Sequence, residues 1–206
     1  MMRGLRVGAL ASLVMLVGGC PDPAGRLDEF LDNTEAERDL PPPKEDLAST
    51  LADINGTFLL ALSSVIDPQH PLQFFTTIEL TQNMDGTGTM TMMLQPLSLE
   101  PQSLTTPRQP VGDVLTLENI AVADDGSFAV DVGTVMVTGM ANPITGSDIV
   151  ATLALQGFIQ DVDLFCGNVT GAVTQPLDYD LAGSTFAATR VPAVDMLPLE
   201  FPMKCP

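Results

Sequence analysis

The chain has 206 residues, of which 45% are hydrophobic and 17% are charged, and it carries 26 acidic against 8 basic side chains. This composition is typical of one modest folded domain and excludes a disordered or fibrous chain. A formal net charge of −18 without any basic cluster excludes nucleic acid as a natural partner, since such a chain repels phosphate. With no Trp, one Tyr and one His, the chain lacks the residues for aromatic cages and multi-histidine metal sites.

The first twenty residues have the pattern of an export signal. Arg3 and Arg6 precede an apolar stretch from Val7 to Val17, which is too short to span a bilayer as a mature helix. The stretch ends in an aliphatic residue, two glycines and Cys20, and this ending resembles the lipobox of bacterial lipoproteins. The resemblance implies cleavage after residue 19 and acylation of Cys20, and it predicts a membrane-anchored protein.

The position after the cysteine bears on which membrane holds such an anchor. In lipoprotein sorting, Asp directly after the cysteine favours the inner membrane, whereas here Pro21 stands there and Asp22 follows. By this resemblance the chain is expected to be exported and anchored in a bacterial outer membrane, with its periplasmic or surface face left open. Several acyl chains on one cysteine would give stable anchoring.

Three cysteines are an odd number, which in an exported protein needs an explanation. Lipidation of Cys20 supplies one, and Cys166 and Cys205 remain as a pair for an oxidising compartment. We therefore predict a disulfide between these two that holds the C-terminal tail to the folded body. Two free buried thiols are the alternative.

We interpret residues 20–55 as an acidic tether. Ten acidic side chains lie between Pro21 and Asp53, with three consecutive prolines at 41–43 that favour an extended spacer. Leu27, Phe30 and Leu31 have the spacing of one short amphipathic helix ahead of those prolines.

From residue 56 the hydrophobic pattern changes to a period of two. Apolar residues recur with this period in two runs, the first with Leu72, Phe74, Ile78 and Leu80 and the second with Met90, Met92 and Leu94. Asp85 and Gly86 between the runs predict a hairpin turn. A second hairpin is predicted at Asp124, Asp125 and Gly126, joining residues 115–117 to 128–132. Further alternating runs lie at 151–155, 165–173 and 183–191. About eight strands are expected, without a helix between them.

Strands that lack helical crossovers pair antiparallel, so residues 56–206 are predicted to form an all-β domain. Eight consecutive strands close into an up-and-down barrel, with a β-sandwich as the alternative. Aromatic residues are only 5% of the chain, and Glu79, Asp131 and Gln156 stand in the middle of strands. These features differ from a membrane-spanning barrel, so the domain is expected to be tethered rather than inserted.

Gly56, Thr57 and Phe58, at the start of the first strand, resemble the Gly-x-Trp opening of lipocalin and wider calycin barrels, with Phe in place of Trp. In that family a basic residue from the last strand lies over the Trp at the closed end. The resemblance implies that Arg190, at the end of the last predicted strand, packs on Phe58.

Candidate catalytic and metal-binding groups are sparse. The only imidazole is His70, between Pro68 and Pro71, which favours an exposed loop residue over a hydrolase triad. Acidic pairs at 124 and 125, at 161 and 163 and at 178 and 180 could bind calcium, although solvated loops explain them better and none has EF-hand spacing. No metal, cofactor or enzymatic activity is therefore predicted.

Two functions fit this pattern. The first is a non-enzymatic, membrane-anchored envelope lipoprotein with a structural or interaction role. The second is a lipocalin-like carrier of a small apolar ligand, which requires a hollow interior. If the barrel is open at one end, eight inward residues are expected to line it: Phe74, Ile78, Met90, Met92, Leu115, Phe128, Val130 and Leu153.

Overall fold

The computed structural model describes residues 22–34 and 51–206. The predicted signal peptide, Cys20 and residues 35–50 of the predicted tether lie outside the described residues. The chain divides into two units, one ending at Asp46 and one beginning at Leu47, and each is considered by itself.

The described part of the first unit is helix α1 (Pro23–Asn33). The Asp22 carboxylate accepts a hydrogen bond from the backbone N–H of Gly25 and caps the amino end, next to a proline in the first turn. At the other end the Thr34 hydroxyl donates to the carbonyl oxygen of Phe30. Leu27 and Phe30 are exposed on this helix.

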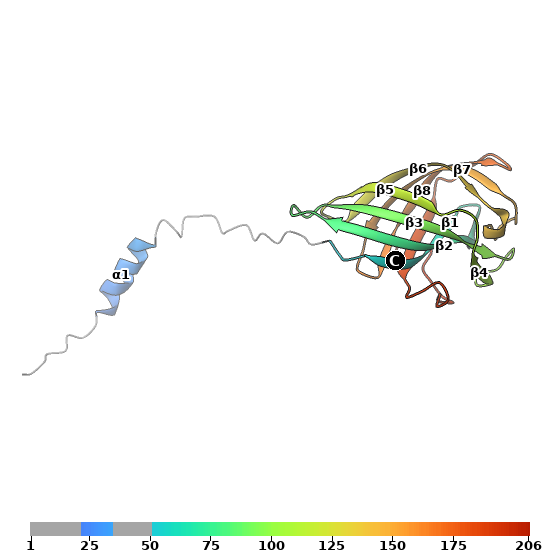
Figure 1. Ribbon diagram of the computed structural model, residues 1–206. Coiled ribbons are helices and arrows are strands. Elements are labelled where there is room, and N and C mark those ends of the chain that lie inside the picture. The colour runs from blue at the N-terminus through green and yellow to red at the C-terminus, as the bar shows by residue number, and fades with distance from the viewer. Residues whose placement is uncertain (1–21, 35–50) are drawn as a thin grey trace, which may run out of the picture. The chain divides into compact units, whose positions relative to one another are not determined.

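The second unit is a closed antiparallel β-barrel (Figure 1). Its strands are β1 (Gly56–Ser64), β2 (Asp67–Gln82), β3 (Gly88–Leu99), β4 (Pro107–Pro110), β5 (Leu115–Val122), β6 (Ser127–Val137), β7 (Ile149–Ile159), β8 (Leu164–Gln175), β9 (Tyr179–Asp180) and β10 (Ser184–Arg190), and a short 3-10 turn, η1 (Gly139–Ala141), follows β6.

Eight strands complete the ring in the order β1, β2, β3, β5, β6, β7, β8 and β10, and β10 pairs again with β1. The two short strands lie off this ring, β4 beside β3 and β9 beside β8. The predicted all-β antiparallel barrel is confirmed, and the sandwich alternative is not what the chain forms. Both predicted hairpin turns, at 85–86 and at 124–126, connect neighbouring strands.

The two ends of the barrel differ in their connections. The end that we call the closed end carries the tight turns β2–β3, β5–β6 and β7–β8, at the left in Figure 1. The opposite end, which we call the open end, carries the tight β1–β2 turn and the three longer connections β3–β5, β6–β7 and β8–β10. Long connections leave room at one end, whereas tight turns bring the walls together at the other.

Phenylalanines fill the interior towards the closed end. Phe165 contacts Phe58, Phe128 and Phe186, with ring centroids 5.1, 6.3 and 6.4 Å away. Gly157 on β7 makes this packing possible, because a Cβ there would come within 2.8 Å of the rings of Phe128 and Phe186. Ring pairs in tilted and edge-on arrangements stabilise a core beyond their burial alone.

Two residues assigned by their sequence to the tether belong to this core. Leu51 is 6% exposed and Ile54 is 0% exposed, and both pack with the residues of the closed end. In the sequence, these two apolar residues stand in an acidic segment, so the composition of the segment indicated a tether. The folded unit thus begins before the first strand.

Candidate ligand-binding cavity

The wall of the barrel is weakest between β5 and β6. A single residue pair, Val122 with Phe128, joins these strands beside their turn, whereas β6 and β7 pair along their whole length. Asn119 has a positive φ of 58° where the β3–β5 register shifts, and Gly133 has a φ of 71° where the β6–β7 register shifts. Bulges bend and twist a strand. One bulge on each strand accounts for their separation towards the open end.

An apolar cavity of about 280 Å³ lies behind this separation. Its inner wall consists of leucines and one phenylalanine from four strands: Leu60, Leu62, Phe74, Leu94, Leu153 and Leu155. A second void of about 70 Å³, with entirely apolar exposed surface, adjoins it towards the open end and shares five lining residues, Phe74 and Leu153 among them. A water molecule in such a void would have few polar partners, so it favours an apolar occupant.

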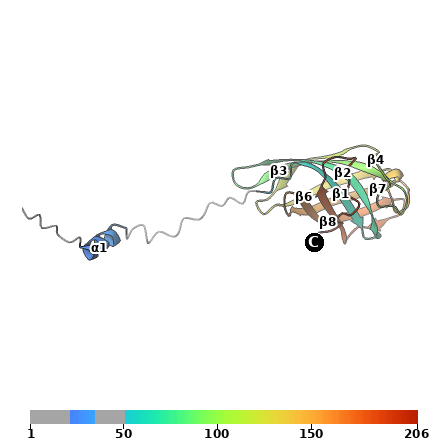
Figure 2. The same ribbon diagram turned by 90° about the horizontal axis from the view of Figure 1, so that it is seen from below.

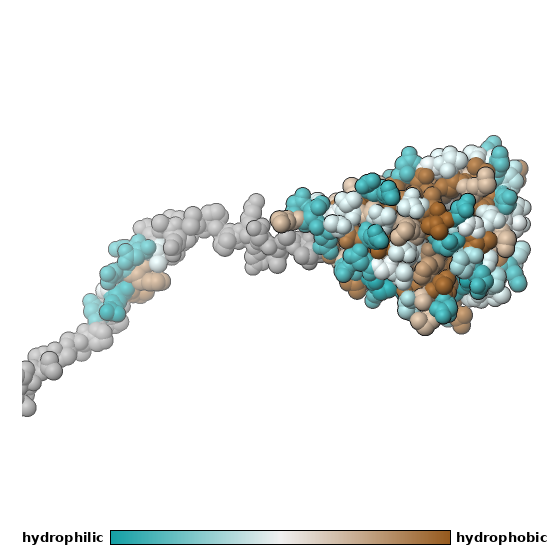
Figure 3. All heavy atoms as spheres, viewed as in Figure 1, coloured by the Kyte–Doolittle hydropathy of each residue, from teal (hydrophilic) through white to brown (hydrophobic). Residues whose placement is uncertain are grey.

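The mouth of the cavity has two lips. One lip is Asp113, Val114 and Leu115, at the start of β5, and the other includes Thr134 and Met136 of β6. Val114 is 51% exposed and Met136 is 75% exposed, so apolar side chains continue from the cavity to the surface. Hydrophobic side chains also reach the surface over the middle of the barrel in Figure 3.

The eight residues expected to line a cavity are divided between the two ends. Phe74, Leu115 and Leu153 line the cavity. Ile78, Met90, Met92 and Phe128 are buried in the packed core, and Val130 is partly buried against it. The four buried residues therefore belong to the core rather than to the cavity wall, in the same packed cluster as Ile54, Phe58 and Phe165.

The lining residues that sequence analysis missed include Leu60, Leu62, Leu94, Val132 and Leu155. The alternation of apolar residues predicts that most of these side chains face inward. It does not predict at which level of the barrel the interior contains a cavity. Val132 lies at the β6 bulge, where the register with β7 shifts.

A larger depression of about 940 Å³ crosses the outside of the barrel over β3, β5, β6, β7 and β8. Small side chains such as Ala121, Ala123 and Ala129 form much of its floor, and it is open to solvent. An open depression shields little of a small apolar ligand from water, so the deeper cavity behind β5 and β6 is the better candidate site.

The closed end is held by Arg190. Its guanidinium lies over the ring of Phe58, 4.7 Å from the ring centroid, in the arrangement that the lipocalin resemblance implied. The same group donates to the carbonyl oxygens of Asp53 at 3.0 Å, of Asn55 at 2.9 Å and of Val162 at 2.9 Å, and pairs with Asp163 at 3.0 Å. The chain that enters the barrel and the β7–β8 turn are thereby joined across this end.

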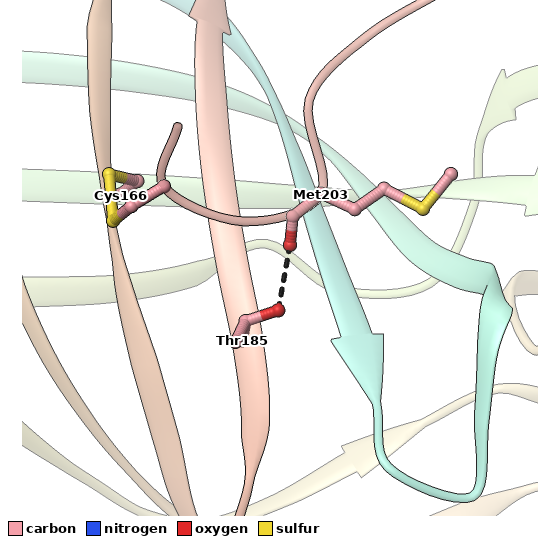
Figure 4. Close-up of a disulfide and its surroundings, with 4 residues drawn as sticks. Cys166, Thr185 and Met203 are labelled. Atoms are coloured by element: carbon pink, nitrogen blue, oxygen red, sulfur yellow. Dashed lines mark hydrogen bonds between the residues drawn. A yellow bond between two sulfur atoms is a disulfide. The ribbon is translucent and has the colours of Figure 1, made fainter.

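The predicted disulfide is present between Cys166 of β8 and Cys205, with Cα atoms 5.3 Å apart. Beside it the Thr185 hydroxyl of β10 donates to the carbonyl oxygen of Met203 at 2.8 Å (Figure 4). Figure 2 shows the C-terminal tail on the outside of the barrel wall. Val191, Val194, Leu197 and Phe201 of this tail pack on an outward cluster that includes Leu59 and Leu97.

The only imidazole of the chain is engaged in local structure. His70 pairs with Asp67 at 2.8 Å, and its hydrogen bond holds the pKa of Asp67 below its usual value. No hydrogen bond among the described residues joins this imidazole to a serine hydroxyl.

One member of each acidic pair takes part in a local turn. Asp125, Asp161 and Asp180 each accept a hydrogen bond from a backbone N–H two residues further on. Within residues 22–34 and 51–206, no three His, Cys, Asp or Glu side chains gather as a metal site would require.

In the described part of the chain, no helix has the length and apolar character needed to cross a membrane. Comparisons of the chain with models of protein families, with curated proteins and with solved structures give no match.

Proposed function

We propose that this chain is an exported, lipid-anchored protein whose barrel binds a small apolar ligand in the cavity behind β5 and β6. The observation that carries the proposal is an apolar void of about 280 Å³ that reaches the surface between two strands joined by one residue pair. Small-molecule sites are concave and mostly apolar, with few polar groups, and this volume is near the lower end of their range of about 300–1,000 Å³. The proposal is a binding function rather than catalysis.

The anchor is the second part of the proposal. The apolar stretch ending at Cys20 resembles a lipoprotein signal, and the proposed location is a bacterial outer membrane. Residues 21–50 would separate the barrel from the bilayer, and their excess of acidic side chains would keep it away from an anionic surface. A ligand-binding barrel at a membrane would have a lipid phase nearby as a source of apolar molecules.

Fluorescence titration with the neutral probe N-phenyl-1-naphthylamine tests the binding function. Residues 21–206, which contain the whole barrel and its core, are purified without detergent. We expect saturable binding at one site. Leu153→Phe adds a ring inside the cavity and is expected to weaken binding at least tenfold, since the added volume occupies the ligand's space.

Leu199→Phe, the same exchange at a tail residue that is 74% exposed, is the matched control and is expected to bind as the unaltered chain does. Leu115→Phe, at the other side of the cavity, replaces Leu153→Phe if that variant fails to fold. Binding that never saturates, or that is equal in the cavity variant and the control, would refute the carrier function. Either result would favour a structural or interaction role.

A further inference from the structure

One carboxylate stands at the mouth of the cavity. Asp113 is the only ionisable residue among those that line the cavity, and none lines the adjoining smaller void. It is exposed on the lip before β5. Its side chain makes no hydrogen bond or ion pair with another described residue, whereas Asp131 on the opposite strand accepts the backbone N–H of Gly133.

The basic side chains of residues 51–206 all lie away from the lining of the cavity. Residues 51–206 carry 17 acidic side chains against three basic ones. Arg108 is buried and donates to the carbonyl oxygens of Leu104 and Pro198. Arg190 is held at the closed end, and Lys204 stands beside the disulfide on the outer surface. A ligand carboxylate at the mouth would therefore meet Asp113 and find no counter-charge.

We propose that the cavity takes a single-chain amphiphile with a cationic head, whose chain enters between β5 and β6 and whose head pairs with Asp113. This inference rests on the proposed binding function and narrows its ligand class. The small volume favours one narrow chain over a two-chain lipid. Exposed Val114 and Met136 flank the carboxylate, so the part of the chain next to the head would also contact apolar surface.

Three ligands with the same ten-carbon chain test this charge preference: decyltrimethylammonium, 1-decanol and decanoate. Each displaces N-phenyl-1-naphthylamine from residues 21–206 at low ionic strength, below its micelle concentration. We expect the cation to bind about fivefold more tightly than the alcohol, as a partly solvated charge pair allows, and decanoate to bind most weakly. In Asp113→Asn the ratio of cation to alcohol affinities is expected to fall to about one.

Asp178→Asn is the matched control, because it removes the same charge from the β8–β9 loop, away from the cavity lining. The affinity ratio is expected to stay as in the unaltered chain. If N-phenyl-1-naphthylamine itself shows no saturable binding, the binding function fails. If the probe binds but 1-decanol does not displace it, the binding function stands and the single-chain ligand class is overturned. If 1-decanol binds but the cation has no advantage, or keeps its advantage in Asp113→Asn, the binding function stands and the assignment of Asp113 is overturned.

Discussion

One side chain, Arg190, joins the segments that cover the closed end of the barrel. A guanidinium offers five N–H donors in a planar fork and an apolar face that stacks on a ring. Here the fork reaches the carbonyl oxygens of Asp53 and Asn55 on one segment and of Val162 on another, while the face covers Phe58. The bonds position the entering segment, and Ile54 of that segment then fills the interior.

The consequence is a difference between Arg and Lys at this position. Arg190→Lys keeps the charge, but its donors all lie on one ammonium nitrogen and it has no planar group, so it cannot serve both segments and the ring together. We expect a loss of about 2 kcal/mol in the free energy of unfolding, measured by urea denaturation. Lys204→Met, which removes an exposed cation, is the control and is expected to change stability by less than about 0.5 kcal/mol. Equal stabilities for Arg190→Lys and the unaltered chain would contradict this role.

At the scale of elements, two hairpins with similar turn sequences behave differently. Both turns contain Asp followed by Gly, yet β2 and β3 pair over nine residues, from Phe74 with Pro96 to Gln82 with Gly88, whereas β5 and β6 pair at one position. The turn residues determine where the chain reverses. The bulges at Asn119 and Gly133 determine how far the strands then stay together, and they create the mouth of the cavity.

The longer hairpin also predicts a pH dependence. Asp85 accepts hydrogen bonds from the hydroxyl and the backbone N–H of Thr87, which hold the pKa of Asp85 below its ordinary value. A carboxyl whose pKa is lower in the folded chain stabilises folding above the unfolded pKa and loses this effect as the pH falls through the folded pKa. Asp85→Asn is thus expected to unfold at a lower temperature than the unaltered chain near pH 7.

This difference in unfolding temperature should shrink as the pH falls below about 4, the ordinary pKa of an Asp carboxyl, and vanish once the pH is below the pKa of Asp85 in the folded chain, where the unaltered carboxyl is protonated as well. Thermal unfolding followed by circular dichroism at a series of pH values measures it. Asp124→Asn is the control for the loss of one charge. The carboxylate of Asp124 lies in a turn but accepts no hydrogen bond from another described residue, since the bond in that turn goes to Asp125. A difference that is constant across this pH range would exclude the proposed cause.

For the whole molecule, the C-terminal tail adds a second layer to part of the barrel wall. Leu59 and Leu97 point outward from β1 and β3, where they would otherwise be exposed to solvent, and the tail covers them with Val194, Leu197 and Phe201. Arg108 bonds to Pro198 within this tail and lies over the ring of Phe201, 5.1 Å from the ring centroid. The disulfide closes the layer by joining the tail to β8.

Removal of the disulfide is expected to destabilise the molecule without abolishing the barrel. Cys166 and Cys205 are 39 residues apart, and a loop of this length implies a loss of about 4 kcal/mol in the chain-entropy description. The Cys166→Ala and Cys205→Ala double variant should unfold at lower urea concentration and be cut faster by trypsin after Lys204. Equal urea midpoints for the oxidised and reduced unaltered chain would contradict this expectation.

The sequence alone was sufficient for the features that depend on local pattern. Alternation along residues 72–80 and 90–94 identified the inner face, the Asp and Gly pairs identified two turns, and cysteine parity identified the Cys166–Cys205 bond. These are local because side-chain alternation and turn conformation are properties of a few neighbouring residues.

Only the tertiary structure decided where the interior is filled and where it is empty. Met90 and Phe74 have the same inward pattern, yet Met90 lies in a packed core and Phe74 faces a cavity. The difference arises from residues distant in sequence, among them Ile54 plugging one end and the bulges of β5 and β6 opening the wall near the other. Packing density depends on all strands meeting at one place, so no single stretch of the chain contains that information.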